Sequence, residues 1–371
     1  MPKVKILHLT FDMHIGGTEQ VIKNLIEGSN DKQFQMSIFC IEEPIGPFGQ
    51  MLQEKGISID STQRREGFDI KLIKSIRQHL KKHGIDIVHC HQYTPWVYGT
   101  LAALGIKTRI IFTEHGRFYP DRTSWKRKII NPLLTLFTDK ITAISKATKQ
   151  ALVDFEYIPE NKIEVIYNGI HAVKVAKEKT KALKTQLDID DSMTIIGTIA
   201  RLDSIKNHPM MFQAFKQVQQ KHPNTKLILV GDGEERQSLE KIANKLNLTE
   251  HIIFTGYITK PEHYMDCMDI FLLPSLSEGT SMTLLEAMSL SKPCVVTDAG
   301  GNPEIIQHNV NGYVTENNNA SAFAEAILDL INKPAVNKKM SEESGNRYEE
   351  LFSSNIMSKK YLKLYLSLRL P

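Results

Sequence analysis

Residues 274–288 (PSLSEGTSMTLLEAM) place two carboxylates beside the start of a helix. A strand-like apolar run ends at Pro274, Glu278 follows, and Gly279, Thr280 and Ser281 open the helix. The first amides of a helix have no partner within it and favour anions. The candidate phosphate ligands are therefore the backbone amides of Met282, Thr283 and Leu284.

Glu286 lies about five residues inside this predicted helix. At a rise of about 1.5 Å per residue, its distance from Glu278 along the axis is roughly that from a ribose to a phosphate. One carboxylate could therefore hold hydroxyls on each side of a diphosphate, which is the layout of a sugar nucleotide. The alternative is a capped amphipathic helix with a chance pair of glutamates.

Two further patterns suit an anionic ligand. Arg201 and Lys206 follow the first strand of the second half (IARLDSIKNH), where a planar guanidinium and a point charge can clamp a diphosphate. Gly16 and Gly17 (GGTE) let backbone amides approach an anion before the first helix. A solvated loop and an ordinary turn are the alternatives. No full G-x-G-x-x-G run accompanies them, which weighs against a dinucleotide cofactor.

His89 and His91 (VHCHQYTPW) end a strand of the first half, so we expect both to face the ligand cleft. An H-x-H pair can also bind a metal, but no third ligand is evident, and we expect no metal. A hydrogen-bonded core histidine is the alternative, more so for His89. His115 (TEHG) and Asp12 are the other candidates for the acceptor side.

Strands and helices alternate along the chain, which predicts βαβ units with parallel sheets. The alternation stops at a lysine-rich stretch (171–192), interpreted as a linker or surface hairpin whose D-x-D string (188–190) is a turn, and then restarts. We therefore expect an α/β protein with two doubly wound Rossmann-like domains facing an interdomain cleft, over 1–172 and 173–353. A terminal helix at 354–371 should pack back on the first domain. Ligands of such sheets bind beyond the carboxyl ends of the strands.

Composition excludes several classes of protein. Of the 371 residues, 41% are hydrophobic and 24% charged, unlike disordered, collagen-like or disulfide-rich chains. No apolar run approaches the roughly 20 residues of a membrane span, and the four cysteines form no C-x-x-C pair, which favours reduced thiols. The first 170 residues carry 23 Lys and Arg against 18 Asp and Glu without a nucleic-acid motif. We expect attraction to phosphates or anionic lipids and no nucleic-acid partner.

The Glu278-x7-Glu286 spacing, the Arg201 and Lys206 pair and the GGTE turn resemble the family-4 retaining glycosyltransferases of the GT-B fold. Residues 165–170 (VIYNGI) resemble that family's interdomain signature, and 300–304 (GGNPE) resemble its next strand-to-helix turn. The resemblance covers nearly the whole chain in the right order. Ala200 and Asn207 stand where glycine is common, which affects loop geometry and not the two cations.

The resemblance implies a role for each candidate. Arg201 and Lys206 would bind the donor diphosphate, helped by the amides of 282–284 and of the Gly16–Gly17 turn. Glu286 would hold the ribose, and Glu278 the donor sugar. The backbone near Ile258 (FTGYI) would meet the base, expected to be uracil. His91 would lie near the reacting sugar, so the expected catalytic residues are Glu278, His91, Arg201 and Lys206.

These roles imply a hexosyltransferase that uses a nucleotide sugar, expected to be a UDP-sugar, and retains the anomeric configuration. Two cations and a helix dipole can stabilise a leaving diphosphate, so we expect no metal and no cofactor. The expected acceptor is a hydroxyl of a lipid-linked or cell-surface polysaccharide. The alternatives are a small soluble acceptor, or a UDP-sugar-binding GT-B protein that is non-catalytic or resembles an epimerase.

A basic and aromatic segment raises the question of membrane contact. Arg122, Trp125 and Lys126 to Lys128 lie beside Ile129 and Ile130. Such a segment can sit at an anionic membrane surface, and an ordinary solvated helix face is the alternative. We expect a cytoplasmic protein with peripheral contact at the inner face of the cell membrane.

Overall fold

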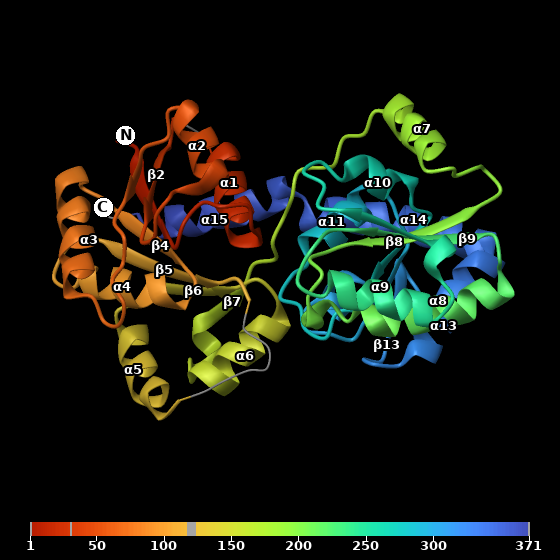
Figure 1. The fold of residues 1–371 in the computed structure, drawn as a ribbon. Coiled ribbons are helices and arrows are strands. Elements are labelled where there is room, and N and C mark those ends of the chain that lie inside the picture. Colours follow the sequence, from red (N-terminus) through yellow and green to blue (C-terminus); the bar gives the residue numbers. More distant parts are fainter. Residues whose placement is uncertain (1, 30–31, 117–123, 370–371) are drawn as a thin grey trace. The chain divides into compact units, whose positions relative to one another are not determined.

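The computed structural model describes residues 2–29, 32–116 and 124–369. The chain divides into two compact units, each a parallel sheet covered by helices (Figure 1). Unit 1 comprises the chain up to His171 together with the segment from Ser353 onward. Unit 2 comprises Ala172–Phe352. Arg122, part of the basic segment, lies outside the described residues.

Unit 1 contains a seven-stranded sheet in the order β3-β2-β1-β4-β5-β6-β7, and all its strand pairs are parallel. The strand order reverses between β1 and β4, so the loops that follow these two strands flank a topological switch point. The strands are β1 (Val4–Thr10), β2 (Phe34–Cys40), β3 (Ile59–Ser61), β4 (Ile87–His91), β5 (Arg109–Glu114), β6 (Lys140–Ala143) and β7 (Ile163–Val165).

The helices of unit 1 cover both faces of this sheet. Local sequence explains their ends: the Asp69 carboxylate accepts hydrogen bonds from two amides at the start of α3, and Gly84 ends that helix at φ +59°. The helices are α1 (Gly17–Glu27), α2 (Gly46–Glu54), α3 (Ile70–His83), α4 (Tyr93–Ala103), α5 (Trp125–Leu136), α6 (Lys146–Glu156) and α15 (Ser354–Ser367).

Helix α15 belongs to unit 1 although it ends the described chain. It packs beside α1 and buries Met357, Tyr361 and Tyr365. The hydroxyl of Tyr365 lies 2.7 Å from Nδ1 of His89 on β4. The unit is therefore completed by a helix that follows the whole of unit 2 in the sequence.

Unit 2 contains a six-stranded parallel sheet in the order β10-β9-β8-β11-β12-β13, which reverses between β8 and β11. The strands are β8 (Thr194–Ile199), β9 (Thr225–Val230), β10 (Ile252–Gly256), β11 (Ile270–Leu273), β12 (Cys294–Thr297) and β13 (Gly312–Thr315). The helices are α7 (Lys177–Gln186), α8 (His208–Lys221), α9 (Arg236–Lys245), α10 (Glu262–Cys267), α11 (Met282–Ser289), α12 (Asn302–Ile305), α13 (Ala320–Asn332) and α14 (Pro334–Arg347).

The lysine-rich stretch is not the linker or hairpin that the sequence suggested, because residues 177–186 form helix α7. Lys, Glu, Ala, Leu and Gln are good helix formers, and their propensity outweighs the weak apolar pattern. The D-x-D string lies just beyond α7, where Asp188 has φ +50° and the Asp190 carboxylate accepts from the Ser192 amide. It forms the expected turn.

All four cysteines are buried and free of disulfides. Among the described helices, none is both long enough and apolar enough to cross a bilayer.

Candidate active site

The strongest candidate residues gather at the switch point of unit 2. The loop after β8 carries Arg201 and Lys206, and the loop after β11 carries Glu278. A backbone hydrogen bond ties the two loops together, from the Leu276 amide to the Ile205 carbonyl (2.8 Å). Strand order therefore joins residues that stand more than seventy positions apart.

Lys206 and Glu278 form an ion pair with 2.6 Å between Nζ and Oε1. The hydroxyl of Ser275 donates to the same carboxylate oxygen at 2.6 Å. The Glu278 side chain is only 9% exposed, so these two partners supply the contacts that a buried carboxylate needs. The cation predicted for the diphosphate and the carboxylate predicted for the sugar thus contact each other directly.

Arg201 is more accessible, with its side chain 75% exposed. Its Nε donates to Asp203 at 2.7 Å. The other carboxylate oxygen of Asp203 accepts from the amides of Ile205 and Lys206 and shapes the turn between the two cations. The guanidinium is oriented by one acceptor and keeps most of its surface for an anion.

The backbone of Glu278 is held by the glycine turn at 300–304. The amide of Gly301 donates to the Glu278 carbonyl at 3.0 Å. Gly300 has φ +52°, and a Cβ there would collide with the same carbonyl. Only glycine allows this close approach without a shift of the loop, so the turn supports the position of Glu278.

The start of α11 offers fewer free amides than the sequence suggested. The Ser281 hydroxyl caps the helix by accepting from the Leu284 amide at 3.3 Å. The amides of Met282 and Thr283 have no acceptor in the part of the chain that the structure describes. Two of the three predicted amides therefore remain available to an anion, beside an already capped third.

Glu286 is the fifth residue of α11 and is half-buried. Burial raises the pKa of its carboxyl to about 7, and the negative charge of Glu262 on α10 adds to the rise. Ile258, expected near the base, follows β10 and is half-buried. Glu286 is thus a desolvated carboxyl group with no ion pair to any residue that the structure describes, and hydroxyl donors from a ligand would stabilise its charged form.

The glycine turn of unit 1 holds a carboxylate of its own. Gly16 precedes α1, and a Cβ there would collide with the side chain of Glu19. Burial raises the pKa of Glu19 to about 7, and Asp12 adds to the rise. Asp12 is half-buried and accepts from the His14 amide at 2.8 Å. A phosphate at this turn would meet Glu19, so protonation of Glu19 favours anion binding here.

The histidines of unit 1 form a buried hydrogen-bonded chain. His8 Nδ1 lies 3.0 Å from His91 Nε2, and His91 Nδ1 lies 2.8 Å from His115 Nε2. His8 and His91 are completely buried. Burial lowers the pKa of His8 and of His115 to about 3 and that of His91 well below its usual value. All three imidazoles are therefore neutral at pH 7.

A neutral imidazole has one N–H donor and one acceptor nitrogen. Both bonds of the chain must therefore run in the same direction, and the tautomer of His8 determines that of His115. The two outer nitrogens, His8 Nε2 and His115 Nδ1, are buried and have no hydrogen-bond partner among the described residues. One of them is a donor whenever the other is an acceptor.

The expectation that His89 and His91 face the cleft is wrong, because neither imidazole has any exposed surface. His89 is a satisfied core histidine: Nδ1 pairs with Tyr365 and Nε2 with Thr113. His8, which pairs with His89 in strand register, supplies the third imidazole that the sequence did not reveal. Nitrogens of these three histidines lie within 4.8 Å of one another, but they already engage each other, Tyr365 and Thr113.

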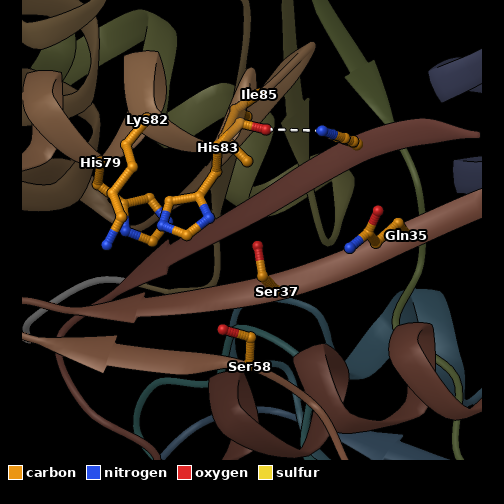
Figure 2. A pocket seen from close by; sticks show the side chains of 8 residues that line it. Gln35, Ser37, Ser58, His79, Lys82, His83 and Ile85 are labelled. Carbon is orange, nitrogen blue, oxygen red and sulfur yellow. Dashed lines mark hydrogen bonds between the residues drawn. The ribbon is translucent and has the colours of Figure 1, made fainter.

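A separate polar pocket of about 240 Å³ lies at the amino-terminal edge of the same sheet (Figure 2). Its lining includes His79 and His83 of α3 and Lys5 of β1, whose ammonium donates to the His83 carbonyl at 2.8 Å. Asp60 lies beside it, 3.3 Å from His79. The loops that carry the candidate residues follow the carboxyl ends of the strands, so this pocket is a distinct feature.

Sequence reasoning missed several residues that shape these sites. Ser275 stands three residues before Glu278 in a segment already singled out, and Asp203 stands between the two cations, so both could have been found. His8 and Glu262 carried no signal, because their partners are far away in the sequence. Glu19 belonged to the glycine motif, but nothing in the sequence indicated its burial.

Two family models match the chain one after the other. The model described as Glycosyltransferase Family 4 matches residues 15–173, and the model described as Glycosyl transferases group 1 matches residues 179–347. Together with the two doubly wound sheets, these matches define the class. The chain belongs to the family-4 glycosyltransferases of the GT-B fold, which confirms the resemblance seen in its motifs and the predicted fold.

Relatives match nearly the whole chain at low identity. A UDP-Gal:alpha-D-GlcNAc-diphosphoundecaprenol alpha-1,3-galactosyltransferase of Escherichia coli is 26% identical over 99% of this chain and 97% of its own length. The N-acetyl-alpha-D-glucosaminyl L-malate synthase of Bacillus anthracis is 27% identical, covering 80% and 79%. Glycosyltransferase activity is common to these relatives, whereas their acceptors differ.

Two solved structures show the same fold. A glycosyltransferase from Rickettsia africae has a TM-score of 0.87 at 22% identity, and the match covers 99% of each chain. Anabaena HepE, solved in complex with UDP, has a TM-score of 0.88 at 21% identity, covering 98% of this chain and all of its own.

Proposed function

We propose that this glycosyltransferase moves a hexose-type unit from a UDP-sugar to a hydroxyl of a lipid-linked or cell-surface saccharide, with retention of configuration. The observation that carries the proposal is the grouping at the switch point of unit 2. It brings together the Lys206–Glu278 pair, the accessible Arg201 and the open amides of α11. The UDP complex of HepE and the name of the Escherichia coli relative support a UDP-sugar donor.

The donor would lie across the start of α11. Its diphosphate would bind Arg201, Lys206 and the amides of Met282 and Thr283, and the base would meet the backbone near Ile258. Glu286 would accept from the ribose hydroxyls, which restores the charged state that burial disfavours. Glu278 would contact the sugar.

The reaction we propose is a front-face displacement. The acceptor oxygen bonds to the anomeric carbon as the bond to the diphosphate breaks, and the leaving phosphate oxygen takes the acceptor proton. Arg201, Lys206 and the α11 dipole stabilise the departing negative charge, so the proposed reaction needs neither metal nor cofactor. We propose that Asp12 and His115 line the acceptor side, and that the buried His91 acts only through His115, to which its Nδ1 is hydrogen-bonded.

The names of two relatives point to different acceptors. The Escherichia coli relative is named for a diphosphoundecaprenol-linked acceptor, which supports a lipid-linked saccharide for a protein matched over nearly its whole length. The Bacillus anthracis relative is named as an N-acetyl-alpha-D-glucosaminyl L-malate synthase, which supports a small soluble acceptor as the second candidate. We propose that the enzyme works in the cytoplasm, at the inner face of the cell membrane.

The first experiment is a thermal-shift panel of nucleotide sugars. A ligand at 100-fold its Kd stabilises the folded state by about 2.7 kcal/mol. A UDP-sugar should therefore raise the Tm of the protein more than the other nucleotide sugars do. The best donor is then incubated with a lipid-linked or a soluble acceptor, and NMR of the product gives the anomeric configuration. Isomerisation of the donor without an acceptor would indicate an epimerase. If the protein catalyses neither transfer nor isomerisation, it is a binding protein. An inverted product would refute retention.

A further inference from the structure

Helix α5 of unit 1 presents a broad apolar face outward. Six large apolar side chains of this segment are 44% to 76% exposed. They are Trp125, Ile129, Ile130, Leu133 and Leu136 of the helix, and Phe137 directly after it. At about 100° per residue, these positions fall within one arc of roughly 140°. The arc is continuous and not a scatter of single exposed residues, which would need no explanation.

The opposite side of α5 anchors the helix to its unit. Asn131, Leu134 and Thr135 are buried there. The Asn131 side-chain amide donates to the Glu156 carboxylate at 2.9 Å, and Arg127 pairs with the same carboxylate at 2.7 Å. The apolar face is therefore held outward by polar contacts on its back.

The charged residues within α5 itself have one sign. Lys126 and Lys128 are exposed near the start of α5, and residues 124–138 contain no Asp or Glu. An apolar arc with lysines near one end, and a tryptophan at the same end, matches helices that lie in the interface of an anionic bilayer. A protein partner would need compensating acidic groups, whereas anionic headgroups form the surface of such a bilayer.

We infer that α5 is a membrane-docking helix that lies in the interface of an anionic lipid bilayer. Trp125, Ile129, Leu133 and Leu136 enter the acyl boundary, and Lys126 and Lys128 contact the lipid phosphates. This inference deepens the proposed function, because docking would bring unit 1 to the surface where a lipid-linked acceptor resides. The docking itself needs neither donor nor acceptor, and its test can therefore fail independently of the enzymatic proposal.

The chain contains a convenient probe, since only two tryptophans are present and Trp96 is fully buried. The full chain is mixed with vesicles of phosphatidylcholine containing about one third phosphatidylglycerol, and with phosphatidylcholine vesicles alone. We expect a blue shift of Trp125 emission, quenching by brominated acyl chains, and co-sedimentation with the anionic vesicles. The emission shift and the quenching should vanish in Trp125→Phe, because the remaining tryptophan is buried.

Two variants separate the apolar and the charge contributions. Ile129→Ser/Leu133→Ser/Leu136→Ser should lower partitioning by at least about tenfold. Lys126→Glu/Lys128→Glu should lower it by at least about 25-fold at low salt, from about fivefold for each lysine charge removed, with repulsion by the new carboxylates adding to the loss. The difference should shrink at about 0.5 M salt. Their matched controls are Tyr257→Ser and Lys179→Glu/Lys181→Glu, exposed residues of unit 2, which should partition like the wild type.

The inference is overturned if anionic vesicles leave the Trp125 emission unchanged, or if the unit 2 controls lose binding as much as the α5 variants do. A concentration-dependent dimer that the triple serine variant abolishes, without any vesicle binding, would instead make this face an interface between two copies. Transfer to a soluble acceptor should continue in all α5 variants, because none of the replaced residues belongs to the proposed site.

Discussion

Lys206 and Glu278 are joined by an ion pair of 2.6 Å, although they come from loops that follow different strands of unit 2. Ser275 donates to the same Glu278 oxygen. The proposed diphosphate cation and the proposed sugar carboxylate are therefore electrostatically coupled. Replacing either residue leaves the other without its ion-pair partner, so a single substitution removes more than one ligand contact.

We expect Lys206→Met to lower the free energy of unfolding by about 1–3 kcal/mol, because it leaves the Glu278 carboxylate buried without a cation. Lys206→Met/Glu278→Gln should recover part of that loss, since the uncompensated charge is gone. Urea unfolding of the four proteins in this cycle measures the coupling. Strictly additive losses would show that the pair does not interact. Arg201→Met is the control: its exposed pair should cost less than about 1 kcal/mol, while transfer still falls.

The two glutamates should fail at different kinetic steps. Glu286→Gln removes charge-assisted bonds to a ribose that does not react, so about 1.5–3 kcal/mol should be lost from UDP affinity and appear in the donor KM. Glu278→Gln should lower kcat, because the sugar gains positive charge only in the transition state. It also frees Lys206, so UDP affinity should stay the same or rise. Titration with free UDP decides between them, and equal affinities of the two variants would show that the division of roles is wrong.

Stability should depend on pH through Glu286. Its carboxyl pKa is raised from 4.5 to about 7 by burial, so between these values the folded protein keeps a proton that the unfolded chain has released. The free energy of unfolding should therefore fall as pH rises from 4.5 to 7 and stay lower above it. This one group accounts for roughly 3 kcal/mol at most. Glu286→Gln should gain stability relative to wild type between pH 5 and 8.

The control for this pH dependence is Glu240→Gln, an exposed glutamate on α9, which should follow the wild-type curve. Glu19→Gln should show the same gain as Glu286→Gln, because burial raises the pKa of Glu19 to about 7 as well. Denaturant midpoints at a series of pH values measure both effects. A constant difference between Glu286→Gln and wild type across this range would contradict the assignment.

His8 should act as a positioning residue for His91. His8→Leu leaves the buried Nε2 of His91 without its partner, which should cost about 1–3 kcal/mol of stability. It should also lower kcat with little change in UDP affinity, since the tautomer of His91 is no longer set. His8→Asn offers an amide near the position of Nδ1 and should restore part of kcat. If both variants lose stability and keep the wild-type kcat, the histidine chain is only structural.

Transfer should be independent of divalent metal. The proposed site stabilises the leaving diphosphate with two side-chain cations and the α11 dipole, so activity in EDTA should equal activity without it. Initial rates with and without chelator, followed by addition of manganese or magnesium, test this. Loss of activity in EDTA with rescue by either ion would support a metal-bound diphosphate. Replacement of His8 or His89 would then test whether the buried histidines are ligands of that metal.

The sequence alone determined the class of fold, and it singled out the candidate residues of the proposed donor site. Alternation of strands and helices predicts parallel sheets because the two periodicities are local. The positions of Glu278 and Glu286 relative to the start of α11 are also local, since both are set within a dozen residues of one chain segment. The resemblance to a family added the order of motifs, which the family models confirm over residues 15–173 and 179–347.

Only the tertiary structure decided which of these residues contact one another and in what state of charge. The Lys206–Glu278 pair follows from the strand order around β8 and β11, and the chain of His8, His91 and His115 follows from the register of β1, β4 and β5. Burial then keeps the histidines neutral and raises the pKa of Glu19 and Glu286. Burial and cross-strand neighbours are sums over distant parts of the chain, so no window of the sequence contains them.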